Sequence, residues 1–158
     1  STSPLDRTDM TPLEGQVVEV LLVEDSPSDA ELCMRSLRKY NLANAVHLVR
    51  DGAEALDFLF CTGPCAGRDP GTGPKLVLLD LKLPRVDGLE VLRQLKANLL
   101  TKHIPVVVLT SSHEEQDLIE SYRLGVNSYI VKPVDFAQFT ESVRQLGLYW
   151  LLLNKTPA

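Results

Sequence analysis

The sequence predicts an α/β fold, in which helices cover both faces of a parallel sheet. Five short apolar runs alternate with five segments whose apolar residues recur at helical spacing. One run, residues 76–79, is apolar throughout, as expected of a strand covered on both faces. Helix-capping residues, Gly and Pro separate the segments. The 158 residues suffice for one ordinary domain and are too few for two.

The first strand is predicted at residues 17–23, which are mostly β-branched or leucine. A helix should follow, because Ser26 suits its N-cap, Pro27 its first position and Asp29 its first turn. We expect this helix to end near Tyr40. Its apolar face comprises Ala30, Cys33, Met34 and Leu37.

The second strand is predicted at residues 46–49, and Asp51 should cap the helix after it. The apolar side of that helix comprises Leu56, Leu59 and Phe60. We expect Cys61 to continue this helix. Residues 62–74 hold four Gly and three Pro, and they predict a loop longer than is usual in α/β units.

The third strand, at residues 76–79, is followed directly by Asp80. Asp87-Gly88 marks the next loop. The third helix is marked by Leu89, Leu92 and Leu95. The fourth strand is predicted at residues 104–109.

The fourth helix should begin at a capping box, residues 112–115, and stop at Gly125. Residues 128–131 form the fifth predicted strand, and Asp135 should cap the last helix.

The last helix is predicted to be long and apolar nearly all round. Its first stripe comprises Phe136, Phe139, Val143, Leu146 and Trp150, and residues 148–153 widen it. Such a helix needs a second covering surface, and we expect a symmetric homodimer interface there. Residues 62–74 or the N-terminal tail are the alternative covers. The domain should therefore span residues 17–154, between tails at 1–16 and 155–158.

Composition excludes several classes of protein. The chain has 16 Lys and Arg against 21 Asp and Glu, a net charge of −5, and no basic run, so general nucleic-acid binding is not expected. No apolar run approaches the ~18 residues of a membrane span, and residues 1–16 lack the apolar core of a secretory signal. Three cysteines fit a reducing compartment. We expect a cytoplasmic protein with no membrane contact.

Charged and hydroxyl residues occupy the ends of the predicted strands. Glu24 and Asp25 follow the first strand, Asp80 the third, Thr110 the fourth and Lys132 the fifth. These ends meet at one edge of a parallel sheet. Crowded carboxylates repel one another, and a divalent cation, best Mg²⁺, would relieve the conflict. Such a site could hold a phosphoryl group for attack by a carboxylate oxygen.

Five motifs in order carry a family resemblance: Leu-Val-Glu-Asp-Ser at 22–26, Leu-Leu-Asp-Leu-Lys-Leu-Pro at 78–84, Asp-Gly at 87–88, Val-Leu-Thr-Ser at 108–111 and Tyr-Ile-Val-Lys-Pro at 129–133. Together they resemble the receiver domain of two-component response regulators, over roughly residues 17–145. The resemblance implies a doubly wound, flavodoxin-like five-stranded sheet in the order 2-1-3-4-5 with five helices.

The resemblance also implies roles for the site residues. Asp80 is the phosphoacceptor. Mg²⁺ is held by the side chains of Asp25 and Asp80 and by the backbone carbonyl of Lys82, and Glu24 helps to organise the metal. The charged side chain of Lys82 departs from the usual uncharged residue there, and it could alter the lifetime of the acyl phosphate.

The remaining implied roles concern the phosphoryl group. Lys132 pairs with it, next to a cis bond to Pro133, and Thr110 donates its hydroxyl to it. Tyr129 changes rotamer as Thr110 moves; simple packing is the alternative role for this tyrosine. The fourth helix, fifth strand and fifth helix form the readout face.

The function implied is that of a stand-alone response regulator that accepts a phosphoryl group from the phosphohistidine of a sensor histidine kinase. It is not an enzyme beyond Mg²⁺-dependent self-phosphorylation and autodephosphorylation. The long loop at 62–74 and the apolar C-terminal run resemble single-domain regulators partnered with bacterial phytochrome kinases, which predicts a light-sensing pathway.

Several alternatives stay open. The receiver could serve a phosphorelay or a non-phytochrome kinase. A phosphohydrolase of the aspartyl-phosphate type would carry a second Asp where Lys82 stands. A flavin-binding module would carry a Ser/Thr/Gly loop where Glu24 and Asp25 stand. A pseudo-receiver acting only as a scaffold would not need the complete set of site residues.

Overall fold

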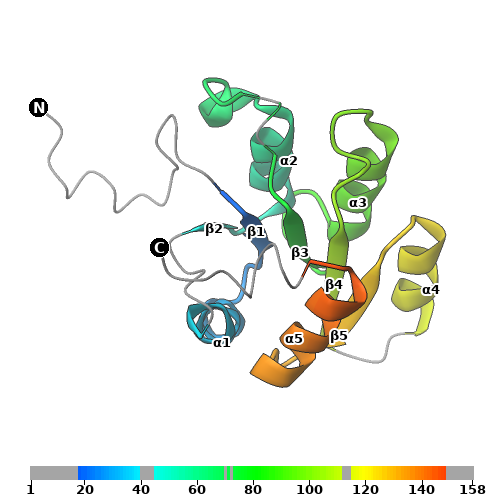
Figure 1. Ribbon diagram of the computed structural model, residues 1–158. Coiled ribbons are helices and arrows are strands. Elements are labelled where there is room, and N and C mark those ends of the chain that lie inside the picture. Colours follow the sequence, from blue (N-terminus) through cyan, green and yellow to red (C-terminus); the bar gives the residue numbers. More distant parts are fainter. Residues whose placement is uncertain (1–17, 40–44, 70, 72, 112–114, 149–158) are drawn as a thin grey trace, which may run out of the picture.

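Five parallel strands form one sheet in the order β2-β1-β3-β4-β5, as Figure 1 shows. The computed structural model describes residues 18–39, 45–69, 71, 73–111 and 115–148. The strands are β1 (Val20–Val23), β2 (Val46–Val49), β3 (Leu76–Asp80), β4 (Val106–Thr110) and β5 (Ser128–Val131). The predicted fold class and strand order are therefore confirmed.

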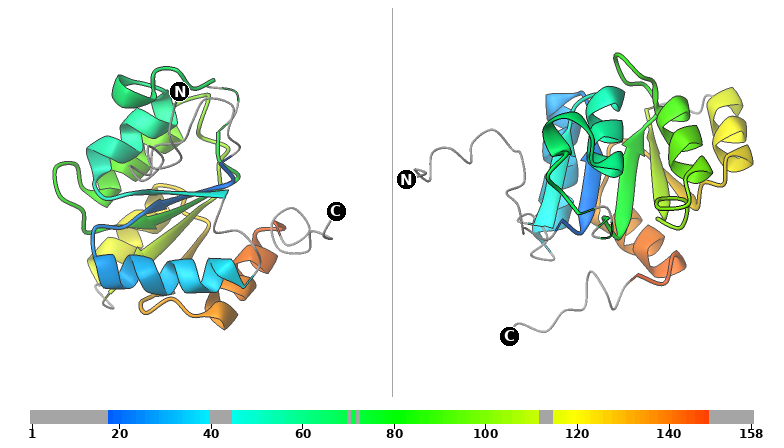
Figure 2. Two further views of the ribbon diagram at one scale, coloured as in Figure 1. Left: turned by 90° about the vertical axis from the view of Figure 1, so that its left-hand side faces the viewer. Right: turned by 90° about the horizontal axis from the view of Figure 1, so that it is seen from above.

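Helices cover both faces of this sheet. They are α1 (Pro27–Arg38), α2 (Gly52–Phe60), α3 (Gly88–Ala97), α4 (Glu115–Arg123) and α5 (Phe136–Gln145), with a short 3₁₀ helix η3 (Gly63–Cys65). Figure 2 shows α1 and α5 on one face, and α2 and α3 on the other. Within the described residues, no helix is both long and apolar enough to cross a membrane.

Side chains of alternate strand residues pack into two separate cores, one on each face of the sheet. In β1, Leu21 and Val23 pack with α2 and α3, whereas Val20 and Leu22 pack with α1 and α5. Every residue of β1, β3 and β4 is buried. The continuous apolar runs in the sequence thus reflect strands covered on both faces.

Three predicted strands have boundaries that differ from the structure, and the third, expected to end at residue 79, extends through Asp80. The fourth strand was expected from residue 104, but β4 begins at Val106, because Pro105 has no N–H to donate to the ladder. It also extends through Thr110. The first strand begins at Val20, and residue 17 lies outside the described residues.

The expected helical continuation at Cys61 is also wrong. Helix α2 ends at Phe60, and Cys61 takes a left-handed conformation with φ of 55°. Pro64 lies three residues further on, and in a continued helix it would lack the N–H for Phe60 O and its ring would clash with that carbonyl. Cys61, Cys65 and Cys33 are all free thiols.

The N-cap residues predicted from the sequence cap their helices in the structure. The side chains of Ser26, Asp51, Asp87 and Asp135 each accept a hydrogen bond from the backbone N–H three residues on. Gly125, the predicted stop of α4, has φ of 82°. The capping box predicted at residues 112–114 lies outside the described residues.

Helix α5 is shorter than predicted. It ends at Gln145, and Gly147 adopts φ of 73° while its N–H donates to Arg144 O. The N–H of Leu148 donates to Val143 O at 3.0 Å, which completes a Schellman motif. Leu148 is buried in the core beneath α1 and α5, so this part of the apolar stripe is covered by the chain itself. Residues 149–158 lie outside the described residues, and with them most of the predicted dimer surface.

Candidate functional site

The carboxyl ends of the strands bring the predicted site residues together. Glu24 and Asp25 follow β1, Asp80 ends β3, and carboxylate oxygens of all three lie within 4.8 Å of one another. Thr110 ends β4, and its carbonyl accepts the backbone N–H of Lys132 at 2.7 Å. The convergence expected from the strand ends is therefore present.

The ammonium of Lys132 joins three carboxylates. Its Nζ donates to Glu24 Oε1 at 2.8 Å, to Asp80 Oδ2 at 3.1 Å and to Asp29 Oδ2 at 3.2 Å. The Lys132 side chain is only 8% exposed. The peptide bond to Pro133 is cis, as the resemblance implies.

Asp29 is the site residue that sequence reasoning missed. The sequence predicts for it only a place in the first turn of α1, where an acidic side chain interacts favourably with the helix dipole. Its position four residues after Asp25 offered a signal, because the first turn of that helix begins at the edge where β1 ends.

Burial sets the electrostatics of the site. Glu24 is fully buried, and desolvation raises its pKa to about 7 against the opposing pull of Lys132. The charge of Asp80 raises the pKa of Glu24 further. Burial lowers the pKa of Lys132, but its bonds to Glu24 and Asp80 outweigh that effect and raise it above the ordinary value. One ammonium thus faces more negative charge than it neutralises.

The acidic cluster fits a divalent cation. Its oxygens come from Glu24, Asp25 and Asp80, and carboxylate oxygens are the ligands that hard cations prefer. Asp25 is exposed, which leaves an open side to the cluster. Glu24 Oε2 is buried and has no hydrogen-bond partner among the described residues. A cation, or water bound to it, would satisfy this oxygen.

The loop after β3 orients the Asp80 carboxylate. The backbone N–H of Lys82 donates to Asp80 Oδ1 at 3.1 Å, and the Lys82 side chain is exposed. Gly88 begins α3 directly against this loop, where its N–H donates to Leu81 O at 2.9 Å. A Cβ at Gly88 would lie 2.4 Å from Asp80 O, so only glycine fits.

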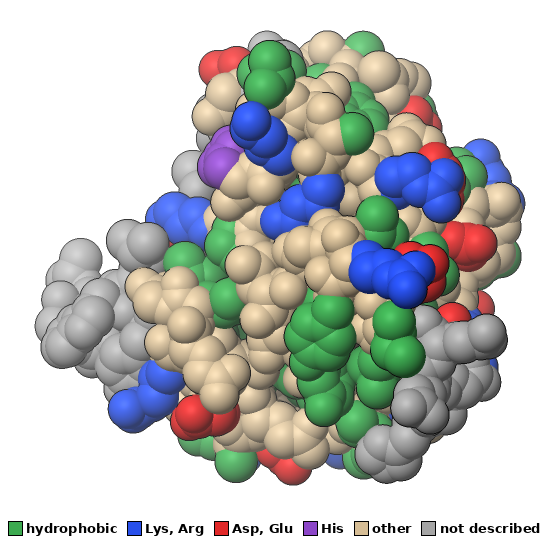
Figure 3. Space-filling view, turned by 90° about the vertical axis from the view of Figure 1, so that its right-hand side faces the viewer, with side chains coloured by type: hydrophobic (Ala, Val, Ile, Leu, Met, Phe, Trp, Pro, Cys, Tyr) green, Lys and Arg blue, Asp and Glu red, His purple; other side chains and the backbone are tan. Residues whose placement is uncertain are grey.

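Thr110 and Tyr129 differ in exposure. Thr110 is buried, whereas Tyr129 is 39% exposed and meets Tyr122 edge to face, with ring centroids 5.9 Å apart. Figure 3 shows the face of the molecule on which α4 and α5 lie, and exposed hydrophobic side chains gather there between scattered Lys and Arg. Ile119 adds to this exposed apolar surface.

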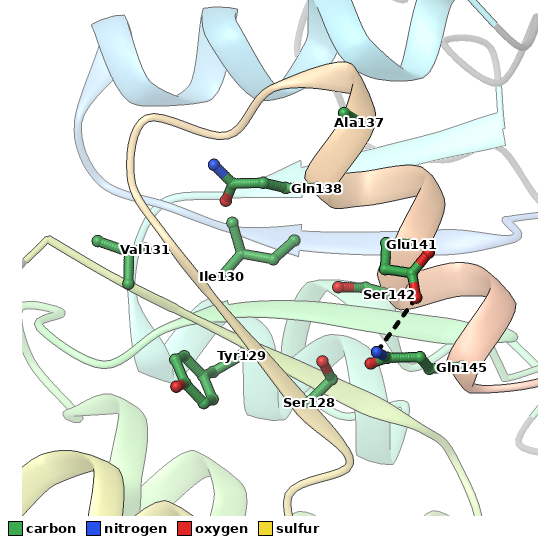
Figure 4. A pocket seen from close by; sticks show the side chains of 9 residues that line it. All are labelled: Ser128, Tyr129, Ile130, Val131, Ala137, Gln138, Glu141, Ser142 and Gln145. Carbon is green, nitrogen blue, oxygen red and sulfur yellow. Dashed lines mark hydrogen bonds between the residues drawn. The ribbon is translucent and has the colours of Figure 1, made fainter.

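A hollow of about 590 Å³ lies between β5 and α5, apart from the acidic cluster. Figure 4 shows its lining, in which Gln145 Nε2 donates to Glu141 Oε1 at 3.3 Å. The full lining is Ser128, Tyr129, Ile130, Val131, Ala137, Gln138, Glu141, Ser142 and Gln145.

The fold and the clustered strand-end residues define the class of protein. Residues 20–144 match the model of the response regulator receiver domain, and the chain belongs to that family. The family acts in signalling rather than in catalysis.

Several individual regulatory proteins are similar to this chain over most of its length. The solved structure of the bacteriophytochrome response regulator AtBRR is 56% identical, with a TM-score of 0.77, and the match covers 89% of this chain and 99% of that one. Response regulator Rcp1 of Synechocystis sp. is 40% identical over 88% of this chain and 92% of its own length. The solved Mn²⁺-bound structure of Rcp1 has a TM-score of 0.70. The match covers 89% of this chain and 99% of that one. The probable methanogenesis regulatory protein FilR2 of Methanothrix harundinacea is 40% identical over 97% of this chain and 96% of its own length.

Proposed function

We propose that Asp80 accepts a phosphoryl group from the phosphohistidine of a sensor histidine kinase. The observation that carries the proposal is the contact of the Lys132 ammonium with Asp80 Oδ2, beside the open, Asp25-bearing side of the cluster. An anionic acceptor with a fixed ammonium next to it suits an incoming phosphoryl group, because phosphoryl transfer depends mainly on positioning and charge stabilisation.

The site would hold Mg²⁺ during this chemistry. Asp25 and Asp80 would provide side-chain oxygens, Lys82 its backbone carbonyl, and Glu24 would organise the metal. The manganese bound to the relative Rcp1 supports a divalent cation here. When bound, the ion would supply positive charge against the oxygens of the phosphoryl group.

The residues of the chain carry the transfer itself. A carboxylate oxygen of Asp80 attacks the phosphorus, the bond from phosphorus to the kinase histidine breaks, and its electron pair stays on the imidazole. Lys132 donates to an oxygen of the transferred group, and the Thr110 hydroxyl donates to another. Later attack by water on the phosphorus would restore the Asp80 carboxylate and release phosphate.

Phosphorylation would then shift an equilibrium between two conformations. Thr110 and Lys132 move toward the phosphoryl group, and Tyr129 changes rotamer as Thr110 moves. The exposed side chains of Ile119, Tyr122 and Tyr129 support a readout face on α4, β5 and α5 that contacts other proteins.

A phytochrome histidine kinase is the proposed phosphodonor, and the similarity to AtBRR over nearly its whole length supports this. A non-phytochrome kinase or a phosphorelay is the second candidate, favoured by the likeness to FilR2. The protein is further proposed to act in the cytoplasm as a homodimer through the region of the C-terminal helix.

The primary test is labelling by a radioactive small phosphodonor such as acetyl phosphate, with and without Mg²⁺. We expect Mg²⁺-dependent, acid-stable label on the wild type and none on Asp80→Asn. Asp69→Asn makes the same chemical change on an exposed loop and should be labelled normally. Persisting label on Asp80→Asn would refute the assignment.

Two measurements test the partners. Label should pass from a phosphorylated phytochrome kinase to the wild type faster than from an unrelated kinase. Equal rates would remove the phytochrome assignment. The mass in solution, with and without phosphodonor, should be that of a dimer, and a monomer in both conditions would contradict the dimer proposal.

A further inference from the structure

The loop between β3 and α3 contains a strained turn at Arg85. Arg85 has φ of 67°, and the N–H of Val86 donates to Pro84 O at 2.8 Å. A hydrogen bond between residues two apart, with a positive φ at the residue between them, defines a rare and strained γ-turn. Contacts from elsewhere in the protein must therefore hold Arg85 in this conformation.

The start of α2 provides those contacts. Arg85 Nη1 donates to Asp51 Oδ2 at 3.2 Å. The N–H of Gly52 donates to Pro84 O at 3.4 Å, and a Cβ at Gly52 would overlap the Val86 carbonyl, so the two segments lie directly against each other. The Asp51 side chain is only 14% exposed and also caps α2, which fixes the carboxylate that Arg85 contacts.

The same loop carries a group of the proposed metal site. Under the proposed function, on which this inference rests, the backbone carbonyl of Lys82 is a ligand of Mg²⁺. Only one residue separates Lys82 from Pro84, and the N–H of Gly88 closes the loop onto Leu81 O at 2.9 Å. In so short a closed loop, a change in the turn must be absorbed by the neighbouring peptide groups, and the Lys82 carbonyl is one of them.

We infer that the ion pair between Asp51 and Arg85 positions the Lys82 carbonyl for the cation by holding the strained turn in place. Both residues lie outside the acidic cluster of Glu24, Asp25 and Asp80, so they act as positioning residues and not as ligands. Without the ion pair, a residue with a Cβ at position 85 favours other backbone conformations, and the loop loses the shape that presents the carbonyl.

The direction of the effect separates this role from simple electrostatics. Arg85→Ala removes a positive charge, which by itself would favour a cation at the acidic cluster. Loss of the turn acts in the opposite direction. Because the Arg85 side chain is 64% exposed, its charge is screened at about 0.15 M salt, and the loss of the turn should dominate. We expect Arg85→Ala to bind the cation about two- to five-fold more weakly, the range for one partly exposed ion pair.

The test is titration of the full chain with Mn²⁺, followed by electron paramagnetic resonance, with Mg²⁺ as competitor. Arg93→Ala is the matched control, because it removes the same charge and an ion pair with Glu90 on α3. Its affinity should not fall below that of the wild type. Arg85→Gly should bind more tightly than Arg85→Ala, because glycine adopts a positive φ without help from an ion pair.

A double-mutant comparison tests whether Asp51 acts through Arg85. Asp51→Asn keeps the oxygen that caps α2 but removes the charge that pairs with Arg85. It should weaken Mn²⁺ binding more in the wild type than in Arg85→Ala.

Four results would each overturn the inference while the proposed function stands. They are an unchanged or higher affinity in Arg85→Ala, an equal loss in Arg93→Ala, an equal loss in Arg85→Gly, and an equal effect of Asp51→Asn in both backgrounds. A wild type that binds neither Mn²⁺ nor Mg²⁺ would overturn the proposed metal site, and the inference with it.

Discussion

Replacing Gly88 by alanine should destabilise the protein by about 2 kcal/mol. The new Cβ would lie 2.4 Å from Asp80 O and 2.5 Å from Leu81 Cα, whereas ordinary contacts begin at 3.4 Å. Both neighbours are backbone atoms, which no rotamer change can move. The strand end and the start of α3 must therefore separate by about 1 Å, although the Gly88 N–H ties them together.

The magnitude follows from two opposing effects. Overpacking of this kind costs about 1–3 kcal/mol, and rigid neighbours favour the upper end. Alanine regains up to about 1 kcal/mol by restricting the unfolded chain and by favouring helix. The net loss of about 2 kcal/mol should lower the Tm by about 4–8 °C for a chain of this length.

Urea unfolding followed by circular dichroism is the assay, with Gly67→Ala as the control. A Cβ at Gly67 meets nothing within 4 Å, so that variant should stay within about 0.5 kcal/mol of the wild type. Because Asp80 lies at the displaced strand end, Gly88→Ala should also be labelled more slowly by a phosphodonor. A Gly88→Ala variant as stable as Gly67→Ala would refute the close-contact argument.

Two further predictions concern buried groups. Lys132→Met should lose on the order of 3 kcal/mol in the absence of metal, because the buried carboxylates of Glu24 and Asp80 lose their counter-charge; Mg²⁺ should restore part of that stability, and an unchanged urea midpoint would contradict the electrostatic account. Cys33 is 1% exposed and burial raises its pKa to about 12, so Ellman's reagent at pH 8 should leave it unmodified until the chain is unfolded in urea; rapid reaction of all three thiols in the native protein would be inconsistent with that burial.

Local sequence patterns predict most of the fold. The strand order needed the family resemblance, but the alternation of strands and helices and the caps did not. The sequence predicts too long a last helix because the run of apolar residues continues past Gly147. A glycine followed by an apolar residue is the signature of a Schellman stop, and Leu148 turns back onto the core there. The end of α2 at Phe60 likewise has a signal in the sequence, because Pro64 cannot donate the helical N–H to Phe60 O.

The sequence predicts those residues of the candidate site that stand at the ends of predicted strands. Asp80 and Lys132 stand directly at such ends, so topology alone places them at one edge. The contact between Asp29 and Lys132 could not be predicted in this way, because it depends on how far the flexible lysine side chain reaches from the end of β5 to the start of α1. The burial of Glu24, which raises its pKa, likewise depends on packing that no local pattern contains.

The lysine that pairs with the carboxylates of the site is also the last of its charged groups to be synthesised. Lys132 follows Glu24 by 108 residues and Asp80 by 52. At about 5–20 residues per second, a ribosome needs about 3 to 10 s to pass from Asp80 to Lys132. During that interval the nascent chain holds the acidic residues of the site without their ammonium. The sheet edge thus receives its ammonium only after the other four strands have been made, and β5, the strand that precedes the lysine, completes the sheet at the same time.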